Sequence, residues 1–565
     1  MKYPYETFKR EVSEQLACAI TAVYGIEADV KLEEPKGMAD VAYPCFSLSK
    51  QVGESPLKIA ETLAKRVEGK WIARVEAVRG YVNVFVNTDM LAAQLLPQIQ
   101  EMGDSFGSQE EKHETVIVEH TSANPNGPLH VGRARNPIIG DTLARLLRFG
   151  GYRVTTQYYV DDMGKQVAIL YWGATHLDME LPEHEKEDHR YVGFYQKAAS
   201  LMETDESVQR EIEEIVKRAE RGDRTLLNEI RSIYGKVLEG MVESLKQLNI
   251  TIDEFVEESR FIFDGSTERV IRELEKSEYT GRDGNALYLD MEPFGVHGRD
   301  KRFYITRNDG TSLYATRDVA YHVWKGEQAD MLINVLGEDH KLEAKFVEVA
   351  LRLLHKKVPE TIFYSFVSLP EGKMSTRKAR VVYLDDLIHE ARERALAEVL
   401  KRRERDDKID HIAHHVAMGA IRYNIIKVRA EKPIVFKWEE ALNFEGQSAP
   451  FIQYAHARCC SILRKAARTP SQVDPHAEYG HESEGELVKT LARFPDVVGE
   501  GVRNRNPSAV AEYAHELASC FNAFYRDCKV LGSPDEEKRL VLVAATRQVL
   551  RNSLHILGIE ALEEM

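Results

Sequence analysis

The sequence predicts a multidomain α/β protein built on a doubly wound parallel sheet with insertions, preceded by an N-terminal α+β domain and followed by a C-terminal α-helical bundle. Three observations predict this fold class. A strand, a polar loop, a helix and a second strand follow one another over 115–160, short apolar runs recur up to residue 367, and from about 385 onward the sequence is almost wholly helical. At 565 residues the chain is too long for one core. The expected domains are 1–110, 111–385 with insertions at about 171–245 and 266–308, and 386–565.

The composition is typical of a soluble globular protein, with 43% hydrophobic and 30% charged residues. The formal net charge of −15 argues against broad binding to nucleic acid, so we expect no DNA partner, although local basic patches can still meet RNA phosphates. The six cysteines show no C-x-x-C spacing, which argues against a structural zinc site and suits a reducing compartment. Without an apolar run of 18 residues or a signal peptide, the chain is expected to be cytoplasmic and to lie outside membranes.

Residues 1–110 form a separate small module in this interpretation. Apolar residues at helical spacing mark a first helix, namely Phe8, Val12, Leu16 and Ile20. Strands are expected at 42–48 and 80–87, the second with clear alternation of apolar and polar positions.

The central unit starts with a short apolar strand at 116–118. A polar turn from Ser122 to Pro128 follows, which cannot continue a strand ladder. Apolar residues at helical spacing from Ile138 to Leu147 predict a helix that ends at Gly150-Gly151, and a second strand covers 152–160. In open α/β sheets the carboxyl end of such a first strand binds ligands, and the exposed helix N-terminal amides there favour phosphate.

The later elements complete the sheet and the bundle. Charged helical sequence dominates 171–265, and we interpret most of it as a structural insertion whose acidic run at 183–188 is solvated. Strands are expected at 286–291, 302–305, 331–336 and 362–367, and helices at 386–403, 411–428, 449–467 and 540–557. His411, His414 and His415 share a helical face without further ligands, so we favour a structural role over a metal site.

Two motifs carry the functional interpretation: Gly127-Pro128-Leu129-His130-Val131-Gly132-Arg133 and, about 240 residues later, Gly372-Lys373-Met374-Ser375-Thr376-Arg377-Lys378. The first is not a Walker loop, and its lone histidine is by itself more often a turn or cap residue. Together the motifs resemble the HIGH and KMSKS elements of class I aminoacyl-tRNA synthetases. The resemblance extends over nearly the whole chain and is specifically to arginyl-tRNA synthetases of the archaeal-like form. It implies a Rossmann-type catalytic domain, an N-terminal domain that contacts the tRNA elbow and a helical anticodon-binding domain.

The residues around the first motif suit recognition of a guanidinium group, which needs carboxylates placed to accept paired hydrogen bonds. Glu119 ends the first strand, and Tyr314 and Asp318 lie four apart, so on a helix they share a face. Taken singly, Glu119 is as well explained as a strand-end residue and Asp318 as a local cap. In the family, the spacings Glu-x-x-Ser-x-Asn and Tyr-x-x-x-Asp hold the amino acid. The resemblance therefore implies arginine binding by Glu119, Ser122, Asn124, Tyr314, Asp318 and His340.

Activation of arginine by ATP needs chiefly alignment and positive charge on the phosphates. The resemblance implies catalytic roles for His130, Arg133, Lys373 and Arg377. It implies that ATP, with Mg²⁺ on its phosphates, is bound by Pro128, His130, Gly132, Gly337, Asp339, His340, Met374 and Ser375. No metal site belonging to the protein is expected.

Three residues depart from the family pattern. Arg133 stands where a second histidine is usual, and a permanently charged guanidinium cannot act as a neutral imidazole. Thr376 replaces the usual lysine of KMSKS, so the charge of that loop must come from its neighbours. Pro137 lies inside the expected first helix, which puts the start or straightness of that helix in doubt.

The helix that opens at Ala449 resembles the family's anticodon-binding region. Tyr454 and His456 offer a stacking surface and Arg458 a phosphate contact, although an aromatic residue at helical spacing is more often part of the core. The chain end at Met565 also matches the family, in which the last residues lie near the anticodon.

The prediction is therefore an arginine–tRNA ligase, an enzyme that forms arginyl-adenylate from L-arginine and ATP and transfers arginine to the terminal adenosine of tRNA(Arg). The resemblance implies that activation requires tRNA, and we expect a monomer. One alternative is a related ligase for another amino acid, against which the paired carboxylates speak. The other is a catalytically silent paralogue that binds RNA, which Arg133 keeps open.

Overall fold

The computed structural model describes residues 3–35, 37, 39–368, 382–466 and 473–565. The N-terminal part packs helices against a three-stranded antiparallel sheet of order β1-β3-β2. Its elements are α1 (Pro4–Tyr24), β1 (Val41–Pro44), α2 (Phe46–Val52), α3 (Pro56–Ala64), β2 (Ile72–Val78) and β3 (Tyr81–Val86). The strand expected at 42–48 is wrong in its second half, because β1 ends at Pro44, which has no N–H for the ladder, and α2 begins two residues later.

The central sheet holds five parallel strands in the order β11-β10-β4-β5-β6. These are β4 (Thr115–Glu119), β5 (Arg153–Val160), β6 (Glu254–Glu257), β10 (Met331–Gly337) and β11 (Glu360–Tyr364). The chain builds outward from β4 first to one side and later to the other, so β4 and β10 flank the point where the strand order reverses. A crevice for ligands forms at the carboxyl ends of such strands.

Helix α5 (Arg135–Phe149) connects β4 to β5, whereas α12 (Tyr314–Gln328) precedes β10 and α13 (Lys341–Leu353) follows it. Pro137 is the third residue of α5. Its missing N–H costs no helical hydrogen bond there, because first-turn amides have no acceptor within the helix. The doubt that Pro137 raised about this helix is thereby resolved.

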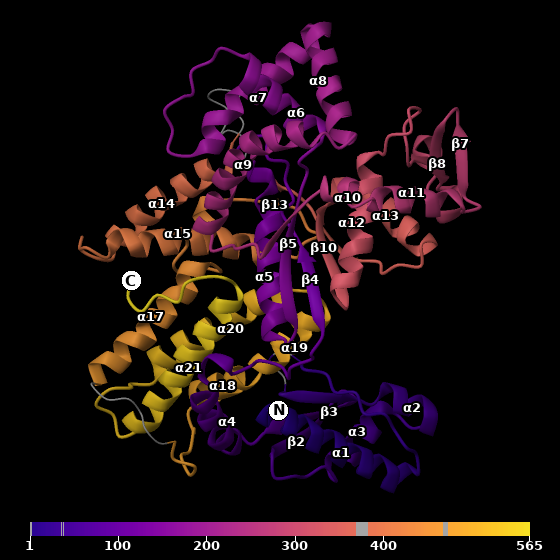
Figure 1. Ribbon diagram of the computed structural model, residues 1–565. Coiled ribbons are helices and arrows are strands. Elements are labelled where there is room, and N and C mark those ends of the chain that lie inside the picture. Colours follow the sequence, from indigo (N-terminus) through magenta and orange to yellow (C-terminus); the bar gives the residue numbers. More distant parts are fainter. Residues whose placement is uncertain (1–2, 36, 38, 369–381, 467–472) are drawn as a thin grey trace.

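Two insertions interrupt the sheet (Figure 1). The first is helical and comprises α6 (Lys165–His176), α7 (Glu187–Thr204), α8 (Glu206–Glu220) and α9 (Arg224–Gln247). The second contains α10 (Arg260–Phe263), α11 (Ser266–Glu275) and a small antiparallel sheet of β7 (Thr280–Asp283), β8 (Ala286–Asp290) and β9 (Arg302–Tyr304). Between them the chain returns to the central sheet as β6. This edge strand has no local signature in the sequence, because its four residues Glu-Phe-Val-Glu are charged at both ends.

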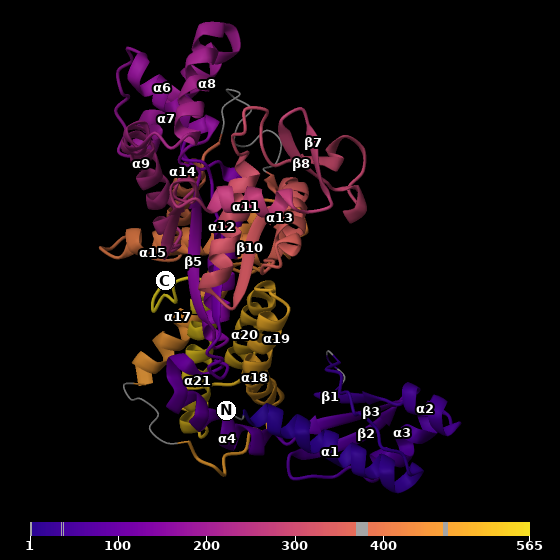
Figure 2. The same ribbon diagram turned by 45° about the vertical axis from the view of Figure 1, so that its right-hand side comes forward.

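The C-terminal part is helical, as expected. Figure 2 shows its first two helices beside the central sheet and the rest between the central sheet and the N-terminal sheet. Its main helices are α14 (Leu384–Leu400), α15 (Ile409–Ile426), α17 (Ala449–Ala466), α18 (Glu482–Ala492), α19 (Phe494–Arg503), α20 (Ser508–Asp527) and α21 (Glu536–Ile556). Arg422 of α15 is fully buried and bonds Asp141 of α5 at 2.6 Å, which ties the bundle to the central sheet. Within the described ranges, none of the helices has the length and apolar character needed to cross a bilayer.

Candidate active site

A row of polar side chains crosses the central sheet near the carboxyl end of β4. Glu119 pairs in register with Asn334 of β10 and with Gln157 of β5, which in turn pairs with Glu254 of β6. Helix α12 covers this row: its Tyr321 hydroxyl donates to Gln157 at 2.9 Å, and its other side chains contact Glu119 and Asn334. Polar groups buried in this way need partners, so the row and the helix fix one another.

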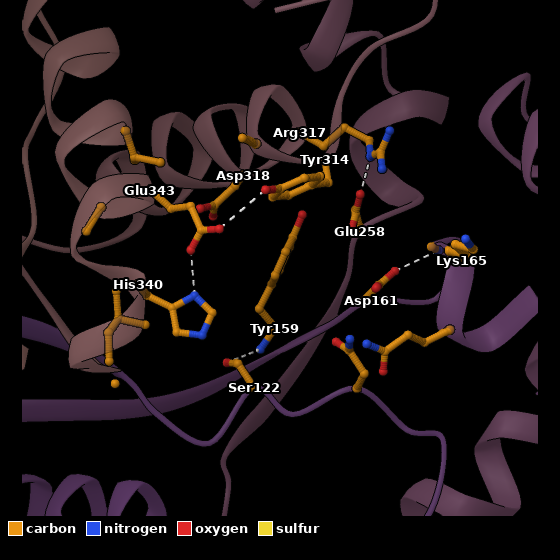
Figure 3. A pocket seen from close by; sticks show the side chains of 18 of the residues that line it. Ser122, Tyr159, Asp161, Lys165, Glu258, Tyr314, Arg317, Asp318, His340 and Glu343 are labelled. Carbon is orange, nitrogen blue, oxygen red and sulfur yellow. Dashed lines mark hydrogen bonds and ion pairs between the residues drawn. The ribbon is translucent and has the colours of Figure 1, made fainter. Parts of the chain in front are cut away.

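A cavity of about 820 Å³ opens above this row. Figure 3 shows that side chains from the β4 loop, β5, α12, and the segment after β10 point into it. The residues of the sequence interpretation that line it are Glu119, Ser122, Asn124, Arg133, Tyr314, Asp318, Gly337, Asp339 and His340. Segments more than 200 residues apart in sequence, such as those of Glu119 and His340, thus share one cavity.

Glu119 and Asp318 lie on either side of the His322 ring. Oε2 of Glu119 is 4.0 Å from Nε2, and Oδ1 of Asp318 is 3.0 Å from Nδ1. Glu119 is buried, while 34% of the Asp318 side chain is exposed, so Asp318 is the more accessible carboxylate. Burial by itself would raise the pKa of Asp318, but the hydrogen bond from His322 and the positive charge of Lys325 outweigh it and lower that pKa.

The loop after β4 is strained. Thr121 and Ser122 both have left-handed backbones, with φ of 71° and 39°. Asn136 of α5 accepts the Thr121 N–H at 2.7 Å, and Ser122 Oγ donates to Glu119 Oε1 at 3.1 Å while it accepts the Tyr159 N–H at 3.0 Å. Non-glycine residues persist in this conformation only where the surroundings hold them, and such residues cluster at functional sites.

The wall formed by α12 and α13 contains an acid that the sequence interpretation missed. Oε2 of Glu343 accepts a hydrogen bond from His340 Nδ1 at 2.6 Å, and its Oε1 accepts one from the Tyr314 hydroxyl at 3.3 Å. The hydrogen bond to Glu343 raises the pKa of His340. Only the spacing of three from His340, which places Glu343 one helical turn later, signalled this contact.

The first motif, residues 127–133, lies only partly in the cavity. Arg133 is exposed and lines the cavity, whereas Pro128, His130 and Gly132 are not among its lining residues. His130 Nδ1 accepts the Gly132 N–H at 3.0 Å, and burial together with Arg133 lowers its pKa, which favours a neutral ring. Lys373, Met374, Ser375, Thr376 and Arg377 lie outside the described residues.

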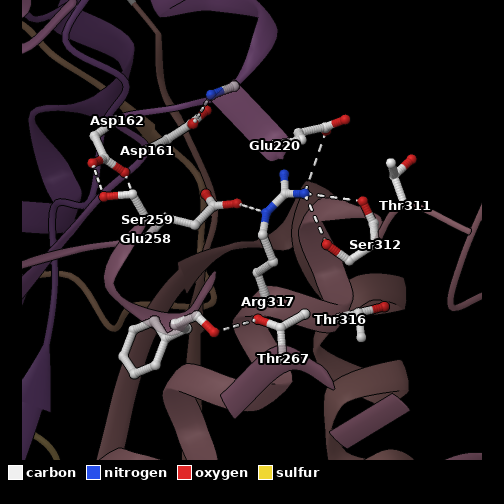
Figure 4. Close-up of polar contacts among 12 residues, drawn as sticks. Asp161, Asp162, Glu220, Glu258, Ser259, Thr267, Thr311, Ser312, Thr316 and Arg317 are labelled. Carbon is white, nitrogen blue, oxygen red and sulfur yellow. Dashed lines mark hydrogen bonds and ion pairs between the residues drawn. The ribbon is translucent and has the colours of Figure 1, made fainter. Parts of the chain in front are cut away.

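Where the helical insertion meets α12 at the cavity wall, buried ion pairs join the two (Figure 4). Arg317 bonds Glu258 and lies 3.4 Å from Glu220, the last residue of α8. Arg307 also contacts Glu220, with distances of 2.5 and 3.0 Å from its two terminal nitrogens. Arg317 directly precedes Asp318, so the insertion is linked to the helix that carries Tyr314 and Asp318. No local pattern in the sequence indicates this network, because Glu220, Glu258 and Arg317 are far apart in the chain.

Of the residues expected to contact tRNA in the bundle, Tyr454 and Arg458 lie together, whereas His456 is buried. The Arg458 guanidinium stacks on the rings of Tyr454 and Tyr525, with its carbon 4.7 and 4.9 Å from their centres. The stacking surface expected of His456 is wrong, because that ring is 2% exposed and contacts the Leu562 carbonyl at 2.8 Å. Instead, His456 lines a second cavity beside the chain end, and its Nε2 has no partner within the described residues. Met565 is half-buried and packs against the core.

A parallel sheet with a cavity at its switch point, an insertion between its halves and a C-terminal helical bundle define a class I aminoacyl-tRNA synthetase. Residues 95–438 match the family described as class I (R) tRNA synthetase catalytic domain, residues 9–86 the arginyl-tRNA synthetase N-terminal domain, and residues 452–565 the DALR anticodon-binding domain. The chain belongs to the arginyl-tRNA synthetase family.

Two relatives and one solved structure illustrate the similarity. The arginine–tRNA ligase of Methanocella arvoryzae is 47% identical, with 96% of this chain and 97% of that protein covered. That of Methanothermobacter thermautotrophicus is 44% identical, with 99% and 100% covered. The structure of Thermus thermophilus arginyl-tRNA synthetase superimposes with a TM-score of 0.82 at 30% identity and covers 98% of this chain and all of that one.

Proposed function

We propose that the protein is an arginine–tRNA ligase, which uses ATP to convert L-arginine into arginyl-adenylate and then transfers arginine to the 3′-terminal adenosine of tRNA(Arg). The observation that carries the proposal is that Glu119 and Asp318, from β4 and α12, approach one imidazole ring at the edge of one cavity. Two fixed acceptors suit a planar cation that can bond both.

Arginine takes the part of the cavity between β4 and α12. Its guanidinium lies between Asp318 and Glu119, while Ser122, Asn124, Tyr314 and His340 border the rest of the amino acid. The proposal is supported by the rigidity of this region, since Ser122 and Tyr314 are both held by hydrogen bonds to neighbouring elements.

ATP takes the part of the cavity at the switch point, beside Gly337, Asp339 and Arg133. A side chain added at Gly337 would come within 2.3 Å of the Asp339 carboxylate and displace it, so a glycine lets this carboxylate keep its place in the cavity wall. Arg133, with Lys373 and Arg377 from the second motif, stabilises negative charge on the pyrophosphate that leaves as the arginine carboxylate attacks the α-phosphate. Mg²⁺ held chiefly by the phosphates suits this arrangement, and the half-exposed Asp339 carboxylate is a fitting additional ligand.

The terminal adenosine of tRNA enters from the insertion side of the cavity, whose wall includes Lys165, Lys217 and Arg307. Tyr454 and Arg458 contact the anticodon arm from the bundle, with the chain end at Met565 nearby. The finer parts of the proposal are that the enzyme is a monomer and that it acts in the cytoplasm.

The test is exchange of pyrophosphate into ATP in the presence of tRNA. It is measured separately with each of the common amino acids. Exchange with arginine supports the proposal. Exchange with a different amino acid would assign another ligase, and none with any amino acid or tRNA would assign a silent RNA-binding paralogue.

A further inference from the structure

Lys325 of α12 has its ammonium group fully buried beneath the active-site cavity. Nζ donates to Oε2 of Glu119 at 2.6 Å and to Oδ1 of Asn334 at 2.9 Å, and it lies 4.4 Å from the centre of the Tyr321 ring. A buried ammonium is costly unless all of its donors are used. These contacts satisfy it, and they also engage the carboxylate that we assign to arginine.

The bond from Lys325 fixes the orientation of the Asn334 amide. A lysine only donates, so the Asn334 atom beside it is the oxygen, and the amide nitrogen therefore faces Nε2 of His322, 2.7 Å away. Because that nitrogen donates, Nε2 of His322 must accept, and the ring proton of the neutral imidazole is on Nδ1. Nδ1 lies 2.9 Å from the backbone carbonyl oxygen of Asp318 and 3.0 Å from its Oδ1, so the ring proton is shared between these two oxygens and contacts the carboxylate.

We propose that Lys325 is a positioning residue that orients both acidic side chains of the arginine pocket. It holds Glu119 directly, and it holds Asp318 through the relay of Asn334 and His322. This inference rests on the proposed function, because it concerns how the two carboxylates are presented to arginine.

The relay also sets the charge of the pocket. Lys325 neutralises one of the two carboxylates, and the neutral His322 adds no positive charge between them, so the pair retains a net charge close to −1. A guanidinium of charge +1 that bridges two held acceptors matches this arrangement. A neutral ureido group matches it poorly, because it carries no positive charge and presents a carbonyl oxygen, which only accepts, in place of one N–H donor of the guanidinium.

The experiment compares wild-type protein with Lys325→Met in pyrophosphate exchange with saturating tRNA. Loss of charge-assisted hydrogen bonds worth about 1.5–3 kcal/mol corresponds to roughly a 10- to 150-fold effect. We expect KM for arginine to rise by this factor while KM for ATP changes less than about twofold. We also expect the ratio of kcat/KM for arginine to that for citrulline to fall about tenfold or more, which general loosening of the structure would not cause.

His322→Gln tests the arm to Asp318 alone and keeps the inference testable if Lys325→Met does not fold. His322→Gln should raise KM for arginine less than Lys325→Met does. In the double variant, KM for arginine should be no higher than in Lys325→Met alone, because both residues act on Asp318 through one relay. Arg422→Lys, at an equally buried ion pair between α15 and α5, is the structural control and should leave KM for arginine within about twofold.

The inference is overturned if the wild type activates arginine but Lys325→Met keeps or lowers KM for arginine, or keeps the citrulline ratio. If the effects of His322→Gln and Lys325→Met on KM for arginine are additive in the double variant, Lys325 does not orient Asp318 through Asn334 and His322. Absence of arginine activation in the wild type would instead overturn the proposed function, so the two failures are distinct.

Discussion

Glu119 and Asp318 approach opposite nitrogens of the His322 ring, although one ends β4 and the other lies on α12 about 200 residues later. Parallel pairing of β4 with β10 brings these elements together, because α12 runs back over the sheet immediately before β10. The recognition of arginine that we propose is therefore a property of the folded sheet rather than of one local segment.

Asp318→Asn keeps the shape of the more exposed carboxylate and removes its charge. We expect KM for arginine in pyrophosphate exchange to rise roughly 10- to 100-fold, because a charge-assisted bond to the guanidinium is lost, with KM for ATP nearly unchanged. Glu327→Gln, an exposed change near the end of the same helix, is the matched control. Equal effects of Asp318→Asn on both substrates would contradict the assignment of Asp318 to arginine.

Arg133→His tests whether permanent charge is needed at the edge of the phosphate site. At pH 8 an imidazole with an ordinary pKa of about 6.5 is neutral, so exchange should fall about tenfold at subsaturating ATP. At pH 6 the histidine gains its proton, and part of the activity relative to wild type should return. Arg282→His, on the small antiparallel sheet, controls for the substitution itself. A variant as active as wild type at pH 8 would show that the charge of Arg133 is immaterial.

Tyr454→Ala tests the bundle. Stacking of a base on an aromatic ring is worth about 1–3 kcal/mol, so KM for tRNA in aminoacylation should rise roughly 5- to 150-fold, while KM for arginine stays the same. Tyr454→Phe retains the ring and should behave as wild type. If both variants bind tRNA normally, Tyr454 serves only to support Arg458.

Asp385 predicts a specific acid dependence of stability. Its carboxylate at the start of α14 bonds Lys186 and His189 of the insertion at 2.6 and 2.8 Å, and despite burial these partners lower its pKa to about 2. A lowered pKa stabilises the fold above the unfolded value of about 3.8 and loses that contribution as pH falls toward 2. Asp385→Asn should therefore reduce the stability lost between pH 5 and pH 3 by about 1 kcal/mol.

The measurement is the urea concentration at half-unfolding at pH 5 and pH 3. Asp178→Asn, an exposed aspartate in the same insertion, should leave the difference between the two pH values unchanged. A difference in Asp385→Asn as large as in wild type would show that the ion pairs do not couple to unfolding.

The sequence predicts the parts of this protein that have a local signature. The helices of the bundle, the strand that ends at Glu119 and the pairs Glu119–Ser122 and Tyr314–Asp318 all follow from periodicity, turn chemistry or motif spacing. Lys325, Asn334 and His322 carry no such signature, because their roles arise only when β4 and β10 pair in register under α12. The ion pair of Glu220 and Arg317 has no local signature for the same reason. The stacking role predicted for His456 is wrong because residue type alone does not reveal that the chain end covers this ring.

The most direct test of the central claim is a crystal structure of the protein with L-arginine bound. We expect the guanidinium to lie within about 3.2 Å of carboxylate oxygens of both Glu119 and Asp318. An arginine whose guanidinium contacts neither carboxylate, or lies outside the cavity between β4 and α12, would contradict the claim that these two residues select the amino acid.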